Sequence, residues 1–536
     1  MTNAVVDTAL KAIASAPEAA QTAPVSQSVE ATSGWLSQLN DWVNVIDDYV
    51  WGVPLISSIL VTGLILTCVL RLVHVFNLKN AFRIMFQGEE EDTGKKAHGE
   101  VSQFGALCTA LSATIGTGNI VGVATAIGTG GPGALFWMEV AAFFGMATKY
   151  AEGLLAVKYR EVAPDGRVLG GPFYYIERGL KGKFGIQNWK WLAVLFALFG
   201  TLAGIMGIGT ITQIHGITSA VQRFFDPNFN PTDMATGLQL FGTTYSVPVV
   251  IAGLIVTACV GLVVIAGAIV TLCVALVVIG GLKRIAAVST VVVPFMAIFY
   301  VVIIAFLLLG NVSKISDAVE LIIRAAFNPS AFTGGVVGTI FIAMQKGIAR
   351  GIFSNEAGLG SAPIAAAAAK TREPVRQGLV CMTGTFIDTI VICTMTGLAI
   401  VVTGAWEPSL GLKGVDITIE AFSRGLSFMG PQSGLFASFF LMLALTFFAF
   451  TTILGWDYYS EKCIEYLGGS RRQWVVYAYR ALYVLVVAIG PYLTVEVVWG
   501  AADVFNGLMA FPNLVALVLL APMVGQATKD YFSRNR

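Results

Sequence analysis

Charged residues are scarce in this chain of 536 residues, where they make up 12% of the sequence, against roughly 25% in an average globular protein. Hydrophobic residues make up 56% and stand in long runs, which indicates that many of them face lipid. One soluble core cannot bury them all, because such cores stop growing beyond roughly 250–300 residues. The composition therefore excludes a soluble enzyme. The net charge of +1 creates no strong field, so we expect no nucleic-acid partner.

Histidine is also rare, with three residues in the whole chain. They lie far apart in the sequence, so no cluster with metal-ligand spacing is visible and metal-dependent hydrolysis has no support. No serine–histidine pair suited to nucleophilic catalysis stands in an apolar run, which argues against an intramembrane enzyme. The seven cysteines form no C-x-x-C pair and are interpreted as small buried residues rather than as a disulfide framework. We also predict no organic cofactor.

The apolar runs are long enough to cross a bilayer, which takes about 20 helical residues. Eleven stretches reach this length, and they predict an all-α integral membrane protein surrounded by lipid. The stretches are residues 53–76, 102–127, 132–157, 190–222, 248–281, 288–310, 334–369, 377–403, 433–466, 473–492 and 495–522. Residues 1–34 are rich in Ala, Ser, Thr and Pro and lack the basic start of a signal peptide, so we predict a disordered tail there.

Lysine and arginine gather in every second connection between these stretches. They follow the first, third, fifth, seventh, ninth and eleventh stretches, whereas the alternate connections hold fewer of them. Because cytoplasmic loops carry the excess of basic residues, we predict that the tail at 1–34 lies outside the cytoplasm and that the tail at 529–536 lies inside it.

Without the first stretch, ten remain, and they divide into two sets of five. An odd number per set gives the two halves opposite orientations, as in the inverted repeats of many secondary transporters. We therefore predict an extra N-terminal helix with its cytoplasmic loop at 35–100, a first five-helix repeat at 101–310 and a second at 311–528.

Two of the stretches contain residues that disfavour a regular helix. Residues 112–122 hold three glycines and an asparagine, and residues 334–363 hold glycines, polar residues and a proline. Small residues also serve close packing between membrane helices. Backbone that unwinds at membrane depth instead lines a cavity, where freed N–H groups face an anion and freed carbonyls face a cation. Interrupted segments at matching places in the two halves favour the second interpretation, which is that of a transporter.

Several runs resemble those of the alanine or glycine:cation symporter family, the sodium:alanine symporters. The matching stretches are residues 116–122, 130–138 (GGPGALFWM), 170–176 (GGPFYYI), 351–362 (GIFSNEAGLGSA), 384–389 (GTFIDT) and 450–456 (FTTILGW). The resemblance covers roughly residues 35–530, and the run at 351–362 is its most specific part. The chain departs from the family at Glu139, where a tryptophan is usual, and at Gln345 and Lys346, where an Arg-Tyr pair is expected.

The resemblance implies a LeuT-type fold and sodium-coupled import of alanine or glycine, across the inner membrane of a bacterial type of cell. In that fold the substrate carboxylate docks on N–H groups of the first broken helix, where the positive end of a helix dipole supports it. The substrate's other flank meets the second broken helix, which is expected to unwind within 341–351. The implied substrate-binding residues are Gly116, Thr117, Gly118 and Asn119 on the first broken helix, with Phe341, Ile342 and Gln345 on the second.

The resemblance also implies a sodium site. Thr451 and Thr452 match the paired hydroxyl residues of the fold's common sodium site, and its other ligands are the carbonyls of Ser112, Ile115 and Phe448. Without the resemblance, two adjacent threonines in a membrane helix more often bond to the carbonyls of the preceding turn.

Asp388 lies near the middle of the eighth stretch. A carboxylate at that depth costs at least about 2.5–3.5 kcal/mol on insertion scales, so it needs a partner. It ligates a second cation, carries a proton or holds two helices together, and a proton-coupled transporter of the same fold is accordingly an alternative function. An ion channel is disfavoured, because polar positions cluster at two breaks rather than along whole helices.

Three charged residues belong to the second interrupted stretch. Lys346, Arg350 and Glu356 are predicted to form a network on the cytoplasmic side that acts as an inner gate.

Overall fold

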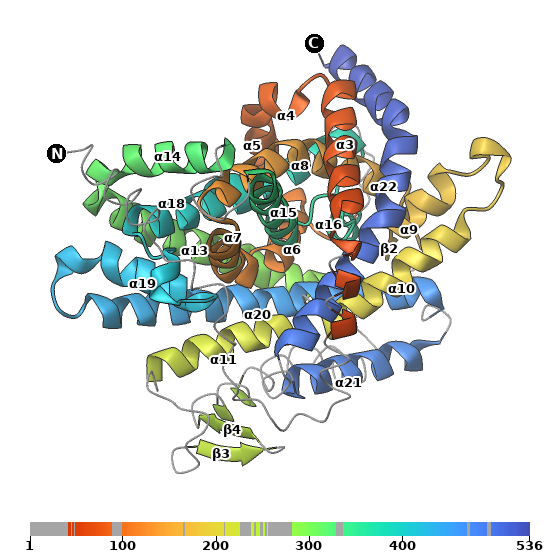
Figure 1. The fold of residues 1–536 in the computed structure, drawn as a ribbon. Helices are drawn as coiled ribbons and strands as arrows, with labels where there is room; N and C mark the ends of the chain where they lie inside the picture. Colours follow the sequence, from red (N-terminus) through yellow and green to blue (C-terminus); the bar gives the residue numbers. More distant parts are fainter. Residues whose placement is uncertain are drawn as a thin grey trace.

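The computed structural model is built almost wholly of helices (Figure 1). It describes residues 41–87 apart from 44 and 48, 99–163, 167–225 apart from 208, 237–240, 243–246, 250–251, 254–255, 281–327, 336–468, 472–489 and 495–535. The strands in these residues form two short antiparallel pairs, β1 (Glu161–Val162) with β2 (Val168–Leu169) and β3 (Gly237–Leu240) with β4 (Thr243–Ser246).

The first half of the chain begins with α3 (Val53–Val69), α4 (Val73–Phe76) and α5 (Leu78–Phe86). There follow α6 (Gln103–Thr114), the π-helical turn η2 (Gly118–Gly122), α7 (Val123–Gly130), α8 (Gly133–Lys158), α9 (Pro172–Tyr174) and the π-helical turn η3 (Tyr175–Gly179). The predicted stretch 190–222 forms two helices, α10 (Lys190–Met206) and α11 (Ile211–Phe225), because the backbone leaves the helical region at Gly207. The half ends with α13 (Gly281–Gly310).

The second half begins with α14 (Val312–Phe327), α15 (Val336–Asn355) and α16 (Ala362–Ala366). The predicted stretch 377–403 is one continuous rod of α17 (Pro374–Thr385), the π-helical segment η6 (Phe386–Cys393) and α18 (Thr394–Thr403). The chain then forms α19 (Val415–Gly425), α20 (Ser433–Leu467), α21 (Gln473–Ile489) and α22 (Val495–Arg534).

Six helical stretches in the described residues are long and apolar enough to cross a membrane, when α10 and the first part of α11 (Lys190–Thr218) count as one. The number is seven when the bent pair α6 and η2–α7 also counts as one span. This content supports an integral membrane protein. The shorter apolar helices α3 and α21 coincide with two further predicted stretches. The predicted stretch 248–281 lies largely outside the described residues, so the expected total of eleven stays a prediction.

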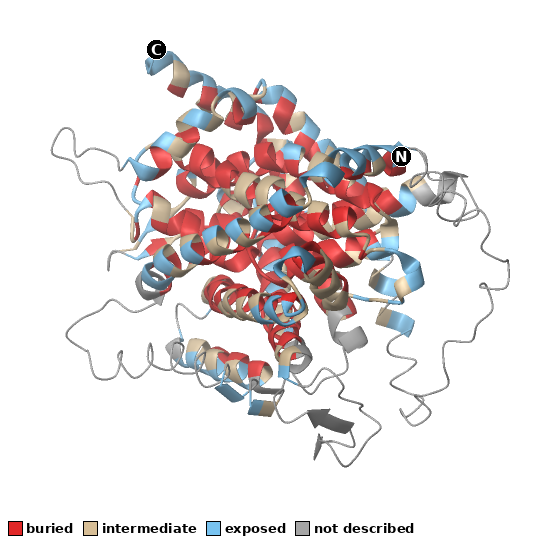
Figure 2. Cartoon of the chain, turned by 90° about the vertical axis from the view of Figure 1, so that its left-hand side faces the viewer, coloured by how far each residue is buried: buried red, intermediate tan, exposed pale blue. Residues whose placement is uncertain are grey.

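Apolar side chains cover the outside of the bundle as well as its core. On α13, exposed apolar residues recur every three or four positions and so form one stripe along the helix. They are Val291, Phe295, Ile298, Val302, Phe306 and Leu309. Such a stripe facing outward suits a lipid solvent, whereas the buried residues concentrate in the middle of the bundle (Figure 2).

Both expected breaks lie at the centre of the bundle, where α6, α7, α15 and α16 come together (Figure 1). The first break bends the helix axis by 54° between Gln103–Thr114 and Gly118–Gly130, and Ile115 takes an extended conformation at its start. This confirms that the segment 112–122 does not form a regular helix.

The second break lies later in the chain than expected. The helix α15 runs without interruption through 341–351, and it ends at Asn355. Positive φ angles then occur at Glu356 (56°), Gly358 (89°) and Gly360 (85°) before α16 begins. Glycine takes this conformation without a Cβ clash, so the paired glycines of GIFSNEAGLGSA allow the chain to turn here. The expectation of unwinding within 341–351 was therefore wrong.

Candidate functional site

Four of the residues predicted to bind sodium meet where the first break packs against α20. The break frees the Ile115 carbonyl, and the Thr452 hydroxyl lies 3.1 Å from that oxygen and 3.0 Å from the carbonyl oxygen of Phe448. The Thr451 hydroxyl donates to the same Phe448 carbonyl at 3.0 Å. All four residues are buried. The threonines thus bond to the preceding turn, as threonines in membrane helices often do, and Thr452 also reaches the unwound backbone.

Ser112, the fifth predicted ligand, lies one turn before the break. Its hydroxyl donates to the Thr109 carbonyl at 2.8 Å. The predicted ligand is the Ser112 carbonyl, and no hydrogen bond joins it to the two threonines among the described residues, so its part in the site stays a prediction.

The close approach of α20 to α6 depends on the glycine at position 455. A Cβ built there would lie 2.8 Å from the Ala113 Cβ and 2.9 Å from the Ala113 Cα, which is closer than a real side chain comes. Gly455 follows Thr452 by three residues and therefore shares its helix face. The glycine thus sets the distance between the Thr452 hydroxyl and the Ile115 carbonyl.

The donor set of this site is uncharged and consists only of oxygen atoms. Two carbonyls and two hydroxyls of this kind suit a hard cation, and the absence of a carboxylate favours a single positive charge over two. No group of three or more His, Cys, Asp or Glu side chains that could hold a metal ion occurs among the residues whose positions the structure gives.

Side chains already bind two N–H groups of the first break. The Gly116 N–H donates to the Asn119 Oδ1 at 2.9 Å, and the Thr117 N–H donates to the Gln213 Oε1 at 3.2 Å. Gln213 comes from α11 and was not predicted, because a single glutamine in an apolar run carries no local pattern. A Cβ at Gly116 would lie 2.7 Å from the Thr452 Oγ1. The hydroxyl predicted to bind the cation and the N–H groups predicted to bind the substrate therefore lie close together at the first break.

Asp388 links the first break to the end of α15. Its Oδ1 accepts from the Asn119 side-chain amide at 2.8 Å, and its Oδ2 accepts from the Ser354 and Thr389 hydroxyls, both at 2.8 Å. These donors come from η2, α15 and η6, and the carboxylate is fully buried. Hydrogen bonds from three neutral donors compensate part of the cost of burying a charge. The aspartate therefore holds three segments together, whatever else it does.

The other predicted substrate residues lie elsewhere. Phe341 and Ile342 keep 51% and 41% of their surface exposed, and the Gln345 amide donates to the Trp51 carbonyl at 3.3 Å. The part of α15 that faces the first break is instead Phe353 and Ser354, whose atoms would lie 3.3 Å from a Cβ at Gly118. These two residues were missed, although they belong to the GIFSNEAGLGSA run.

Two of the three charged residues expected to form one network, Arg350 and Glu356, have different partners. Arg350 pairs with Asp503 of α22 at 3.1 Å, and the backbone carbonyl of Asp503 accepts from the Trp51 indole at 2.7 Å. Glu356 accepts from the Trp456 indole at 2.9 Å and from a serine in its own break. The structure thus separates Arg350 and Glu356 into two clusters rather than joining them in one gate.

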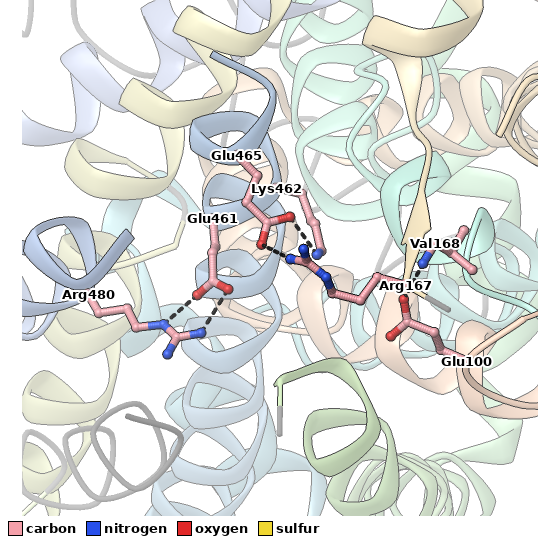
Figure 3. Close-up of polar contacts among 7 residues, drawn as sticks. All are labelled: Glu100, Arg167, Val168, Glu461, Lys462, Glu465 and Arg480. Carbon is pink, nitrogen blue, oxygen red and sulfur yellow. Dashed lines mark hydrogen bonds and ion pairs between the residues drawn. The ribbon is translucent and has the colours of Figure 1, made fainter. Parts of the chain in front are cut away.

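A further ionic cluster surrounds the C-terminal end of α20 (Figure 3). Arg480 of α21 forms two hydrogen bonds to Glu461, at 2.7 and 2.8 Å. One turn on, Glu465 accepts from Lys462 at 2.7 Å, and Arg167, next to β2, lies 3.9 Å from it. These pairs tie the end of α20 to α21 and to the β1–β2 hairpin.

Comparisons with known proteins agree with the sequence motifs. The sequence pattern of the sodium:alanine symporter family matches residues 36–536. The sodium/alanine symporter AgcS of Methanococcus maripaludis is 42% identical over 91% of this chain and 96% of its own length. The putative sodium/proton-dependent alanine carrier YrbD of Bacillus subtilis is 36% identical over 92% of each chain. The probable sodium/glutamine symporter GlnT of the same organism is 33% identical, covering 92% of this chain and 91% of its own.

Proposed function

This chain belongs to the sodium:alanine symporter family and is a transporter rather than an enzyme, and on that premise we propose that it imports alanine, glycine or both with sodium by alternating access. The observation that carries the proposal is the contact of Thr452 with the unwound Ile115 carbonyl, because it joins paired hydroxyls to a helix break at membrane depth. The relative AgcS, a sodium/alanine symporter, supports alanine and sodium as the transported pair.

Sodium binds between α6 and α20 in this proposal. Its ligands are the Ile115 and Phe448 carbonyls and the Thr451 and Thr452 hydroxyls, with the Ser112 carbonyl as a fifth. A bound cation draws the first break against α20, and the ion thereby orders the N–H groups that receive the substrate. Coupling follows, because the ion and the substrate stabilise the same conformation.

The substrate carboxylate docks on the N–H groups of Gly116, Thr117 and Gly118. It replaces the Asn119 and Gln213 oxygens that accept from this segment in the structure, at the N-terminal, positive end of the helix formed by η2 and α7. The closeness of Phe353 to Gly118 limits the space for a side chain and favours a small amino acid. One methylene is worth about 1–3 kcal/mol in a pocket, so discrimination between alanine and glycine is modest.

The architecture that we propose is a LeuT-type inverted repeat of ten spans preceded by one extra helix, within the boundaries given above. Two breaks at matching places, in α6–α7 and α15–α16, support it. The distribution of basic loops supports an outer N-terminus and a cytoplasmic C-terminus in a cell membrane of bacterial type.

Proton coupling is the second candidate function. Asp388 is the carboxylate that would carry it, because it accepts from Asn119 in the first break and from Ser354 in the last turn of α15. The relative YrbD, a putative sodium/proton-dependent alanine carrier, favours keeping this alternative.

Uptake of radiolabelled alanine into proteoliposomes tests the proposal. Concentrative uptake should require an inward sodium gradient and should be lost in a Thr451→Ala/Thr452→Ala variant. Thr446→Ala is the matched control, because the Thr446 hydroxyl donates to a carbonyl of its own helix, at Met442. Alanine uptake that does not depend on sodium but is driven by a pH gradient would favour proton coupling through Asp388 instead. An absence of alanine uptake under both gradients overturns the substrate assignment.

A further inference from the structure

The second break is held from outside by side chains of two other helices. The Gly358 N–H donates to the Glu152 Oε1 of α8 at 3.2 Å, and the Gly358 carbonyl accepts from the Asn513 amide of α22 at 2.9 Å. The same Asn513 nitrogen donates to the Glu152 Oε1 at 2.7 Å. Gly358, Glu152 and Asn513 therefore form a closed ring of hydrogen bonds, in which both the N–H and the carbonyl of Gly358 have a side-chain partner.

The orientation of the Asn513 amide follows from its partners. A carboxylate and a carbonyl can only accept, so the amide nitrogen must face Glu152 and Gly358. The Asn513 oxygen on the other side accepts from the Tyr175 hydroxyl. Asn513, Glu152 and Tyr175 are all buried without measurable exposure, so water cannot replace these bonds when one partner is removed.

This arrangement gives the GGPFYYI run a role that the ion and substrate sites do not use. Tyr175 of that run sits at the start of η3 and connects through Asn513 to Gly358. Asn513 also packs against the break, because a Cβ at Gly360 would lie 3.0 Å from its Cγ. A chain of hydrogen bonds thus runs from a motif outside the long helices to the centre of the bundle.

The clamp lies close in sequence to the side chains that face the first break. Ser354 and Asn355 precede Gly358 by four and three residues and bind Asp388 and Thr389. The residues between them and Gly358 include Glu356, whose positive φ is strained and persists only where its surroundings hold it. A fixed Gly358 therefore fixes the direction in which Ser354 and Asn355 point.

We propose that Asn513 is a positioning residue for transport: together with Glu152 it clamps Gly358, and the clamp aims the end of α15 at Asp388 and the first break. The inference rests on the proposed function, since what it positions is the ion and substrate site. Asn513 itself contacts neither the predicted ligands nor the carboxylate-binding N–H groups in the described structure.

A pairwise exchange of the two side chains tests the clamp. Asn513→Asp removes both donors and sets a carboxylate against Glu152, so half-saturating concentrations of sodium and alanine should rise about tenfold per reconstituted transporter. Adding Glu152→Gln returns the pair to its original net charge, and the glutamine amide can then donate to the new aspartate, but the Gly358 carbonyl still has no donor from residue 513. The double variant should therefore recover only part of the loss, because the repulsion between two carboxylates is gone, while both half-saturation values stay above those of the parent protein.

Asn506→Asp is the matched control. Asn506 lies two turns earlier on α22, is fully buried, and its amide has no partner among the described residues. This variant buries a carboxylate on the same helix without touching the clamp, and it should lower the amount of folded protein while leaving the half-saturation values of the folded fraction near those of the parent.

Unchanged half-saturation values in Asn513→Asp overturn the inference, as does a double variant no better than the single one. If Asn513→Asp does not fold, the double variant alone decides: raised half-saturation values support the clamp, and parent-like values overturn it. A parent protein that fails to carry alanine with sodium refutes only the proposed function. The variants are then compared with the neutral amino acid and gradient that do drive the parent.

Discussion

A single methyl group at position 455 should weaken sodium activation without adding or removing a ligand. The Cβ of a Gly455→Ala variant would lie 2.8–2.9 Å from atoms of Ala113, two of them backbone, whereas ordinary contact begins near 3.4 Å. The two helices must therefore separate by about 0.5 Å at this point, since backbone cannot rotate out of the way. Overpacking of this kind costs typically 1–3 kcal/mol.

The separation acts directly on the ion site. Thr452 lies on the same helix face one turn earlier, so its 3.1 Å distance to the Ile115 carbonyl should lengthen to about 3.6 Å, beyond hydrogen-bond range. If the strain destabilises the sodium-bound state by about 1.4 kcal/mol relative to the sodium-free state, the sodium concentration for half-maximal uptake rises about tenfold. The assay is initial alanine uptake into proteoliposomes over a range of external sodium.

Gly434→Ala is the control on the same helix, because the new Cβ would meet only the rotatable Ser423 hydroxyl, at 3.2 Å. It should leave sodium activation unchanged. A Gly455→Ala protein that folds normally and keeps the parent's sodium dependence refutes the argument that this contact sets the geometry of the site.

Two more substitutions separate the central site from the ionic cluster. Asp388→Asn replaces one acceptor oxygen of the carboxylate by an amide group that donates, so at least one of the three side-chain donors to Asp388 loses its acceptor. Alanine uptake at low alanine concentration should fall tenfold or more. Measuring uptake under a sodium gradient and under a pH gradient separately shows which of the two gradients depends on the carboxylate. Glu461→Gln removes the charge from the paired hydrogen bonds of Arg480 and should lower the thermal unfolding midpoint of the purified protein, while sodium half-saturation in the uptake assay stays at the parent value.

The sequence predicted the first break well because the signal is local. Glycines and an asparagine in the middle of an apolar run disfavour a helix whatever surrounds them, and the structure bends between Thr114 and Gly118. The family motif also named the carbonyls to which the paired threonines bond in the structure, while their role as sodium ligands stays a prediction. In both cases a few consecutive residues hold the information.

The second break shows where local signals end. Glycines occur at 347 and 351 as well as at 358 and 360, yet only the last pair has positive φ. Gly347 and Gly351 instead pack against α8, where a Cβ at Gly347 would meet the Ala134 carbonyl oxygen at 2.1 Å. Composition cannot distinguish a glycine that bends the chain from one that lets two helices touch.

Single polar residues were the hardest to predict. Gln213 lies 96 residues from its partner Thr117, and Asn513 lies 361 residues from Glu152. Neither is part of a local pattern, because each acquires its role only when distant helices are packed together. Phe341 and Ile342 were chosen by sequence position on the second broken helix, and the later break shifts the contact to Phe353 and Ser354.

The hydrogen bonds of the Thr451 and Thr452 hydroxyls also affect how easily an ion is bound and released. Each gives its hydrogen to a carbonyl that is also a proposed sodium ligand, so neither threonine hydroxyl lacks an acceptor. An arriving ion must turn both hydrogens away, and its affinity is the difference between new ion–oxygen contacts and the internal bonds they displace. If sodium binds here as proposed, the internal hydrogen bonds compete with it, and we expect the ion to leave the site readily where its concentration is low.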